Sequence, residues 1–257
     1  MRFAKSIRLD QLLVVRGLAV SRTQAKALIE SGLVKVGGRL ALKASQIVSA
    51  GETPEVIQHP RYVSRGGLKL EAAISGFELD FVGTVVLDVG ASTGGFTDCV
   101  LQAGAARVVC VDLGTGRLHE KLQRDPRVVN FEQLNVRNLG AVRLPDPDFD
   151  RIVIDVSFIS LRLVLPEVWP LLRQGGQLVA LVKPQFEAGR QEVSRGRGVI
   201  RDDGVRQCVL ADIREFAAEV LVGAIDRGAG IECPTSGSNG NREFLWLFSR
   251  FADDPAE

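Results

Sequence analysis

Residues Leu87–Val100 have the sequence LDVGASTGGFTDCV. An apolar run contains one acidic residue, Asp88, and a turn of glycines and other small residues follows before the apolar pattern resumes. This order predicts a strand, a glycine-rich turn and a helix, and in an open α/β sheet such a turn lies at the carboxyl end of the strand, where ligands bind. We therefore expect a ligand to contact bare backbone at Gly90 and its neighbours.

Strands and helices alternate around this stretch. Apolar, β-branched runs predict strands at 85–89, 107–112, 128–131, 151–154, 177–182, 220–226 and 243–249. Helices are predicted at 95–102, 117–123, 161–173 and 204–219. This alternation indicates the α/β class with a doubly wound, mostly parallel sheet. Only a loop separates the last two strands, so we expect them to form a hairpin at the sheet edge.

Two nucleotide classes fit the glycine turn poorly. A P-loop needs a lysine at the helix start, and the chain has no lysine between Lys69 and Lys121. The dinucleotide fingerprint needs a second glycine where the backbone approaches the pyrophosphate, and Ser92 stands there. ATP bound by a P-loop is therefore excluded, and NAD is disfavoured.

S-adenosylmethionine fits the turn better, because it carries no phosphate. Asp88 at the end of one strand suits the ammonium group of its methionine part, and Asp112 at the end of the next strand suits the ribose hydroxyls. The competing interpretation is that Gly94 and Gly95 only permit tight packing between helix and strand.

Two further strand ends carry ionisable side chains. Asp155 follows a β-branched strand in RIVIDVSFIS, and Lys183 follows another in LVALVKPQFE. The carboxyl ends of parallel strands meet at one edge, so both side chains should lie near the glycine turn. Alternatively, Lys183 is an exposed strand end and Asp155 is a helix N-cap. Ser157 is also suited to cap that helix, which would leave Asp155 available.

The first 60 residues differ in charge from the rest. They contain nine Lys/Arg and four Asp/Glu, a net charge of +5, whereas the remainder contains 23 Lys/Arg and 27 Asp/Glu, a net charge of −4. Helical spacing predicts one helix around Leu9–Leu13 and a second capped by Ser21, and two short strands flank the glycine pair at 37–38. This segment is either a polyanion-binding module or a merely solvated basic face.

A second basic segment, GRQEVSRGRGVIRDD, follows Lys183 and includes Arg195 and Arg197. It is either a disordered surface loop or an RNA clamp beside the site. Arg65 and Lys69 would extend the same positive track.

Composition also limits the other classes. The four cysteines show no metal-type spacing and the chain has two histidines, so no metal site is expected. The longest apolar stretch, residues 152–172, is interrupted by charges and prolines, and no signal peptide is evident. We therefore expect a cytoplasmic protein without a membrane partner.

The N-terminal motifs RLDQLL, SRTQAKALIESGLVKVGG and KASQIVSAGE resemble the S4 RNA-binding domain. By that resemblance, Arg8, Arg22 and Lys26 would face RNA, where Arg and Lys neutralise phosphates. Phe3 is the only aromatic residue in this segment, so we expect recognition of structured RNA by shape and backbone.

The rest of the chain resembles the FtsJ-type ribose 2′-O-methyltransferases, and the whole chain resembles the hemolysin-A (TlyA-like) family. The motifs VSRGGLKLEAA, IDVSFIS, VKPQFE and GSNGNREFL match the catalytic Lys-Asp-Lys-Glu set of that type at Lys69, Asp155, Lys183 and Glu243. The resemblance implies a seven-stranded, Rossmann-like methyltransferase domain at 84–252, an S4-like domain at 1–60 and an entry segment at 61–83.

The implied activity is S-adenosylmethionine-dependent 2′-O-methylation of ribosomal RNA, at cytidine in 16S or 23S rRNA, with ribosomal RNA or subunits as partners. The residues expected at the methyl donor are Asp88, Gly90, Ala91, Ser92, Gly94, Gly95, Phe96, Asp112 and Leu113. The sequence leaves open whether Lys69 or Lys183 is the base; we favour Lys183, and either role requires a depressed lysine pKa. The alternatives are a membrane-acting hemolysin and an RNA-binding ribosome factor without catalysis.

Overall fold

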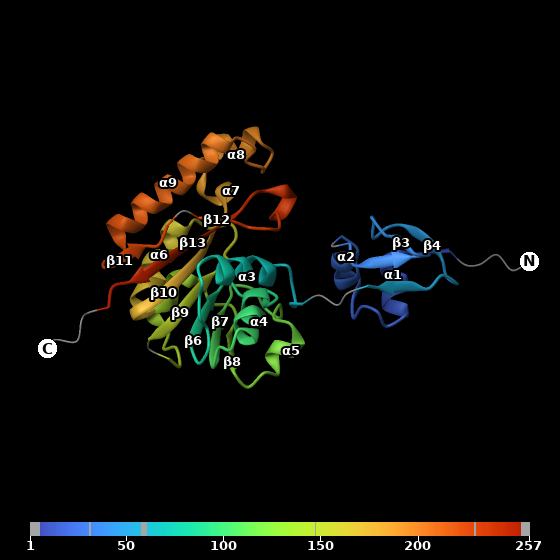
Figure 1. Cartoon of the computed structure of the whole chain (residues 1–257), viewed down its shortest axis with the longest axis horizontal. Coiled ribbons are helices and arrows are strands. Elements are labelled where there is room, and N and C mark those ends of the chain that lie inside the picture. The colour runs from blue at the N-terminus through green and yellow to red at the C-terminus, as the bar shows by residue number, and fades with distance from the viewer. Residues whose placement is uncertain (1–5, 31, 58–60, 147, 229, 253–257) are drawn as a thin grey trace, which may run out of the picture. The chain divides into compact units, whose positions relative to one another are not determined.

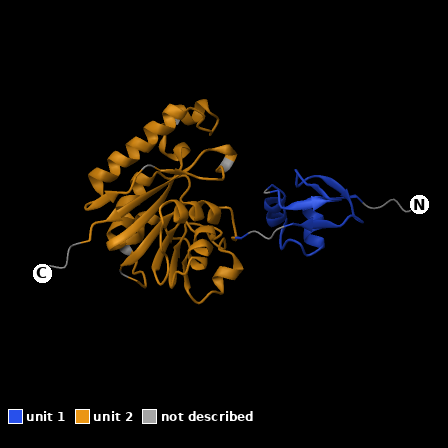
Figure 2. Cartoon of the chain, viewed as in Figure 1, with its two compact units in different colours: residues 1–61 blue, residues 62–257 orange. Residues whose placement is uncertain are grey.

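The computed structural model describes residues 6–30, 32–57, 61–146, 148–228 and 230–252. The chain forms two compact units, residues 1–61 and residues 62–257 (Figure 2). Among the helices in the described part of the chain, none combines the length and apolar character that a bilayer-spanning helix requires.

The first unit packs two helices against short antiparallel strands. Its elements in chain order are β1 (Ser6–Arg8), α1 (Leu9–Val15), α2 (Arg22–Glu30), β2 (Val34–Val36), β3 (Arg39–Leu40), β4 (Ile47–Ser49) and β5 (Pro54–Val56). β1 pairs with β4, and β2 lies between β3 and β5. Leu9 and Leu13 of α1 and Ala25 and Ile29 of α2 are buried in its core, so the helical spacing predicts the correct inward faces. Ser21 accepts a hydrogen bond from the Gln24 amide, as its predicted cap position requires.

The second unit is built on one large, mostly parallel sheet (Figure 1). Its strands are β6 (Val85–Val89), β7 (Arg107–Val111), β8 (Val128–Phe131), β9 (Phe149–Ile154), β10 (Leu172–Val182), β11 (Ala224–Asp226) and β13 (Phe244–Arg250). In the described part of the chain, seven strands form the order β11-β13-β10-β9-β6-β7-β8, and a short β12 (Ile231–Glu232) pairs with β13. β13 is antiparallel to both β10 and β11, whereas the remaining neighbours on this path are parallel.

The strand order reverses between β6 and β9. From β6 the chain continues through β7 and β8 on one side, and β9 and β10 lie on the other. Connections from such a point leave in opposite directions and open a crevice at the carboxyl ends of the two central strands. The glycine turn follows β6 and Asp155 follows β9, so both predicted site segments border this crevice.

Helices cover both faces of the sheet, and the hydrophobic core is correspondingly divided in two (Figure 1). The covering helices are α3 (Gly66–Gly76), α4 (Gly95–Gln102) and α5 (Glu120–Gln123) on one side, and α6 (Leu161–Val168) and α9 (Asp203–Val220) on the other. Along β6, Leu87 and Val89 belong to one core cluster and Val86 to the other. Alternate residues of a strand face opposite sides of a sheet, so β6, which is buried on both sides, is apolar except for Asp88.

Several predicted boundaries differ from the structure. The helix predicted at 161–173 ends at Val168, a 3₁₀ turn covers Trp169–Leu171, and β10 begins at Leu172. Proline at the second position of that turn cannot continue the hydrogen bonding of the preceding helix. α9 extends to Val220, so the strand predicted at 220–226 is limited to Ala224–Asp226. The predicted edge hairpin is present as the antiparallel pair of β11 and β13.

The glycine turn combines close packing with an open wall. Gly94 has φ +90° and precedes α4, and a Cβ there would collide with Leu122 of α5. A Cβ at Gly95 would collide with Ser64. A Cβ at Gly90 would collide with the backbone carbonyl of Asp155. The tight packing that Gly94 and Gly95 were expected to permit is therefore present in this turn.

Candidate active site

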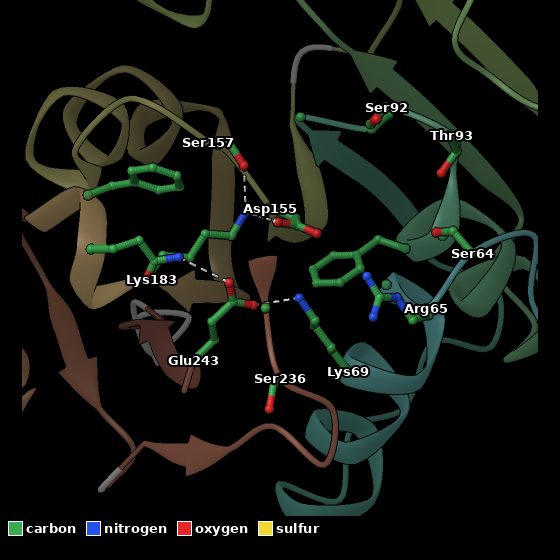
Figure 3. A pocket seen from close by; sticks show the side chains of 18 residues that line it. Ser64, Arg65, Lys69, Ser92, Thr93, Asp155, Ser157, Lys183, Ser236 and Glu243 are labelled. Carbon is green, nitrogen blue, oxygen red and sulfur yellow. Dashed lines mark hydrogen bonds and ion pairs between the residues drawn. The ribbon is translucent and has the colours of Figure 1, made fainter. Parts of the chain in front are cut away.

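A cavity of ≈ 320 Å³ lies at the carboxyl edge of the sheet (Figure 3). Its walls come from the start of α3, the glycine turn after β6, the segments after β9 and β10, and the segment before β13. The cavity has the size of a small-molecule site. All four residues of the predicted catalytic set line it: Lys69, Asp155, Lys183 and Glu243.

The topology of the sheet explains how these side chains meet. Asp155 and Lys183 directly follow the parallel strands β9 and β10, so both lie at the same edge. Glu243 directly precedes β13, which is antiparallel to β10, and Phe244 pairs with Val182. The start of an antiparallel strand lies beside the end of its partner, which brings Glu243 to Lys183.

The first ion pair joins the buried Lys183 to the partly exposed Asp155. Their Nζ and Oδ1 atoms are 2.5 Å apart, and Lys183 also donates a hydrogen bond of 2.9 Å to the Ser157 hydroxyl. Lys183 is 7% exposed, so the amine is held inside the wall of the cavity. The helix cap prediction for Ser157 is wrong, because Ser160 caps α6 by accepting from the Arg162 amide. Ser157 instead orients the amine of Lys183.

The second ion pair joins Lys69 of α3 to Glu243, and both of these residues are buried. Nζ and Oε2 are 2.5 Å apart, and the Gln185 amide donates to Oε1 of the same carboxylate at 3.3 Å. Gly237 packs directly against this carboxylate, where any side chain would collide with it. Because Glu243 is held on three sides, it has one orientation. Each lysine thus has its own carboxylate partner in this structure, and Gln185 is a site residue that the sequence analysis missed.

The residues predicted for the methyl donor divide into two groups. Among the described residues, those that line the cavity are Gly90, Ala91, Ser92, Gly95 and Phe96. Those that do not line it are Asp88, Gly94, Asp112 and Leu113. The first group presents mainly backbone from the glycine turn, as the sequence pattern predicts.

Asp88 lies beneath the glycine turn and is fully buried. Its Oδ2 accepts a hydrogen bond of 2.5 Å from the Thr97 hydroxyl of α4, and Oδ1 has no hydrogen-bond partner among the described residues. Burial, supported by the negative charge of Asp155, raises the pKa of this carboxyl to about 7. The structure therefore places Asp88 as a buried support of the turn, with one oxygen still able to accept a hydrogen bond.

Asp112 fixes the same turn from the neighbouring strand. Its Oδ2 accepts from the Ser92 amide at 2.8 Å, and its Oδ1 accepts from the Gly114 amide at 2.6 Å. Ser92 takes a positive φ of 48°, a conformation that this hydrogen bond helps to stabilise. Leu113 follows it with an exposed side chain. Both residues thus shape the rim next to the glycine turn.

Two aromatic side chains lie beside Lys183. Phe186 lines the cavity, and its ring centroid is 5.0 Å from that of Phe158. Phe158 is 91% exposed and has a φ of +65°, so a large apolar ring is held in solvent by a strained backbone. The sequence motif IDVSFIS contains this residue, but its exposure depends on the loop conformation and was not predicted.

The predicted RNA-binding residues lie in three places. Arg65 lines the cavity beside Lys69, whereas Arg195 and Arg197 are not among its lining residues. Arg195 is paired with Glu192 within α8 (Arg190–Arg195), and Arg197 follows that helix. Arg8, Arg22 and Lys26 belong to the first unit.

The arginine-rich segment after α8 is anchored next to the catalytic set. The Asn241 side chain donates to the Gly198 carbonyl at 2.9 Å and accepts from the Ile200 amide at 3.0 Å. Asn241 lies two residues before Glu243 and is buried. This part of the segment is therefore ordered and connected to the wall of the cavity rather than being a free loop.

The strand order, the reversal between β6 and β9, and the two lysine–carboxylate pairs that line the cavity at this edge are those of a Rossmann-like methyltransferase. Comparison with protein families agrees: residues 62–250 match the FtsJ-like methyltransferase model, and residues 7–53 match the S4 domain. The chain belongs to the FtsJ-like methyltransferase family, within the TlyA/hemolysin A group that also carries an S4 domain. The predicted family and fold class are thereby confirmed.

Relatives match along almost the whole chain. The 16S/23S rRNA (cytidine-2'-O)-methyltransferase TlyA of Mycobacterium tuberculosis is 40% identical over 247 residues, which are 95% of this chain and 90% of that protein. Hemolysin A of Brachyspira hyodysenteriae is 37% identical over 242 residues, which are 94% of this chain and 99% of that protein. A solved structure assigned as a hemolysin of Streptococcus thermophilus has a TM-score of 0.74 at 39% identity, with 98% of this chain and 93% of that chain covered.

Proposed function

We propose that this protein transfers a methyl group from S-adenosylmethionine to the ribose 2′-hydroxyl of a cytidine in ribosomal RNA. One observation carries the proposal: two lysine–carboxylate pairs, one of them fully buried, line the same cavity as the glycine turn. The relative from Mycobacterium tuberculosis, which aligns over 95% of the chain, bears the name of this activity.

The glycine turn fits the methyl donor. Gly90, Ala91 and Gly95 line the cavity, and the buried Asp88 carboxyl supports their turn from beneath. Such a site suits a ligand with an amino-acid end and without phosphate. When bound, S-adenosylmethionine supplies a methyl group on a positively charged sulfonium, and Ser92, Phe96, Asp112 and Leu113 form the adjacent rim.

The ion pairs organise the acceptor side. In the transfer, a carbon–oxygen bond forms at the 2′-hydroxyl, the carbon–sulfur bond breaks and the hydroxyl proton leaves. We assign this proton to Lys183 Nζ, which accepts it after passing one of its own protons to the paired Asp155 carboxylate. Asp155 and Ser157 hold that amine at 2.5 Å and 2.9 Å, and Lys69 and Glu243 fix the opposite wall. Preorganised groups of this kind lower the barrier by positioning and by electrostatics.

The RNA side is supported by charge and by aromatic surface. The match to the S4 domain covers residues 7–53, and Arg65 adds a cation at the cavity itself. Phe158, supported by Phe186, offers an exposed ring on which a base can stack. Arg195 and Arg197 follow on the anchored segment. We propose ribosomal RNA or a ribosomal subunit as the partner, bound by the S4-like domain at residues 1–60 and modified by the domain at 84–252.

The test is methylation of ribosomal subunits by the purified protein with labelled S-adenosylmethionine, with 2′-O-methyl sites mapped by mass spectrometry. Lys183→Met should reduce the rate by ~10²–10⁴-fold, the usual contribution of a general base, while donor binding measured by calorimetry persists. Arg124→Met removes an exposed cation of the Arg124–Glu120 pair outside the cavity and serves as the control. If the wild type modifies neither subunit nor free rRNA, the proposed function is wrong. If Lys183→Met keeps the full rate, Lys183 is not the base.

A further inference from the structure

A buried carboxylate lies among the basic residues of the first unit. Asp10, in the first turn of α1, is 4% exposed, although residues 1–60 carry a net charge of +5, from nine Lys/Arg and four Asp/Glu. A buried acid costs free energy unless it is fully paired, so its partners indicate what it does.

Two arginines share the Asp10 carboxylate. Arg8 donates from Nε to Oδ1 and from Nη2 to Oδ2, both at 3.0 Å, which is the planar two-point geometry of a guanidinium fork. Arg22, at the start of α2, donates from Nη2 to Oδ2 at 2.9 Å. The Gln11 amide also donates to Oδ1 at 3.0 Å. Four donors thus use the acceptor capacity of the carboxylate.

The outer faces of the two arginines stay in solvent. Their side chains are 39% and 56% exposed, against 6% for Asp10. Both guanidinium groups approach the same oxygen, so they lie side by side, and most of their N–H donors remain available. The pKa of Asp10 is lowered to about 2, first by the hydrogen bond from Arg8, so the carboxylate stays charged at neutral pH.

We propose that Asp10 is a positioning residue for nucleic-acid binding, which holds Arg8 and Arg22 as one rigid pair that takes an RNA phosphate. The inference rests on the proposed function, because it assumes that the first unit binds ribosomal RNA. An arginine side chain loses rotamer freedom when it binds, and Asp10 removes this cost before RNA arrives. The three groups together carry one net positive charge in a fixed position.

This role makes a prediction opposite to that of simple charge counting. Removing an acid from a basic surface should strengthen RNA binding, because phosphate attraction increases. If Asp10 holds the arginines, Asp10→Asn should weaken binding instead, by about tenfold, from the cost of ordering two long side chains. Glu30→Gln is the matched control: it removes an exposed acid of α2 that pairs with Lys26 at 3.7 Å, and it should leave binding unchanged or tighter.

The experiment measures the affinity of the full-length variants for purified ribosomal subunits and for free 16S and 23S rRNA at several salt concentrations. Arg8→Lys provides a second variant, which keeps the charge but loses the two-point contact, and it should also weaken binding. Circular dichroism of each variant shows whether the first unit is folded, and donor binding to the second unit should be unchanged. If Asp10→Asn binds as tightly as the wild type or more tightly, the inference is wrong. If the wild type binds no ribosomal RNA, the proposed function fails instead.

Discussion

Replacement of Asp88 by asparagine should change how the stability of the second unit depends on pH. Burial raises the pKa of this carboxyl to about 7, whereas an aspartate in an unfolded chain titrates near pH 4. The folded protein therefore binds the proton more tightly than the unfolded chain. The stability that this group contributes is fully present below about pH 4 and is lost as the pH rises to about 7.

The size of the effect follows from the shift. Three pKa units correspond to about 4 kcal/mol, at about 1.4 kcal/mol for each unit. Asp88→Asn cannot ionise, so the free energy of unfolding of this variant should gain about 4 kcal/mol relative to the wild type between pH 4 and pH 8. If the new amide beside Thr97 destabilises the variant, this cost is the same at pH 4 and at pH 8. It therefore leaves the pH dependence of the difference in unfolding free energy unchanged.

Urea denaturation followed by tryptophan fluorescence measures how the unfolding free energy of the second unit, residues 62–257, depends on pH. The chain has two tryptophans, and Trp169 and Trp246 both belong to the core of the second unit. Glu219→Gln, at an exposed position on α9, serves as the control and should leave the pH dependence unchanged. A difference between Asp88→Asn and the wild type that stays constant from pH 4 to pH 8 would refute a buried, proton-binding Asp88.

Three further changes test the packing and the site. Gly94→Ala should cost more than about 2 kcal/mol in urea denaturation, because φ is +90° and the Cβ meets Leu122, whereas Gly116→Ala, with φ +63° and open space, should cost about 1 kcal/mol. Lys69→Met leaves Glu243 buried and unpaired, so it should lower the free energy of unfolding by about 3–5 kcal/mol. The double variant with Glu243→Gln should recover part of this loss. If the effects of the two single changes simply add, the two residues are not a coupled pair. Phe158→Ala should leave the melting temperature unchanged and weaken rRNA binding by about 1–3 kcal/mol per stacked base, and unchanged affinity would exclude stacking.

The predictions that succeeded depend on local pattern. The strand, glycine turn and helix at Leu87–Val100 follow from apolar periodicity and from glycine conformational freedom, both of which are properties of neighbouring residues. Asp155 and Lys183 were placed together for a similar reason, since parallel strands expose their carboxyl ends at one edge. The inward faces of α1 and α2 also follow from helical spacing alone.

What the sequence by itself determined is thus the α/β class, the position of the glycine turn and the strand-end residues around it. Only the tertiary structure decided which side chains these charged residues pair with. Glu243 reaches Lys69 across 174 residues because β13 runs antiparallel to β10 and α3 packs beside it. Asp88 lies beneath the turn rather than in the cavity, and Asp10 holds one arginine from the end of β1 and one from α2. Such contacts join segments that are distant in sequence, and only the packing of strands and helices sets their distances.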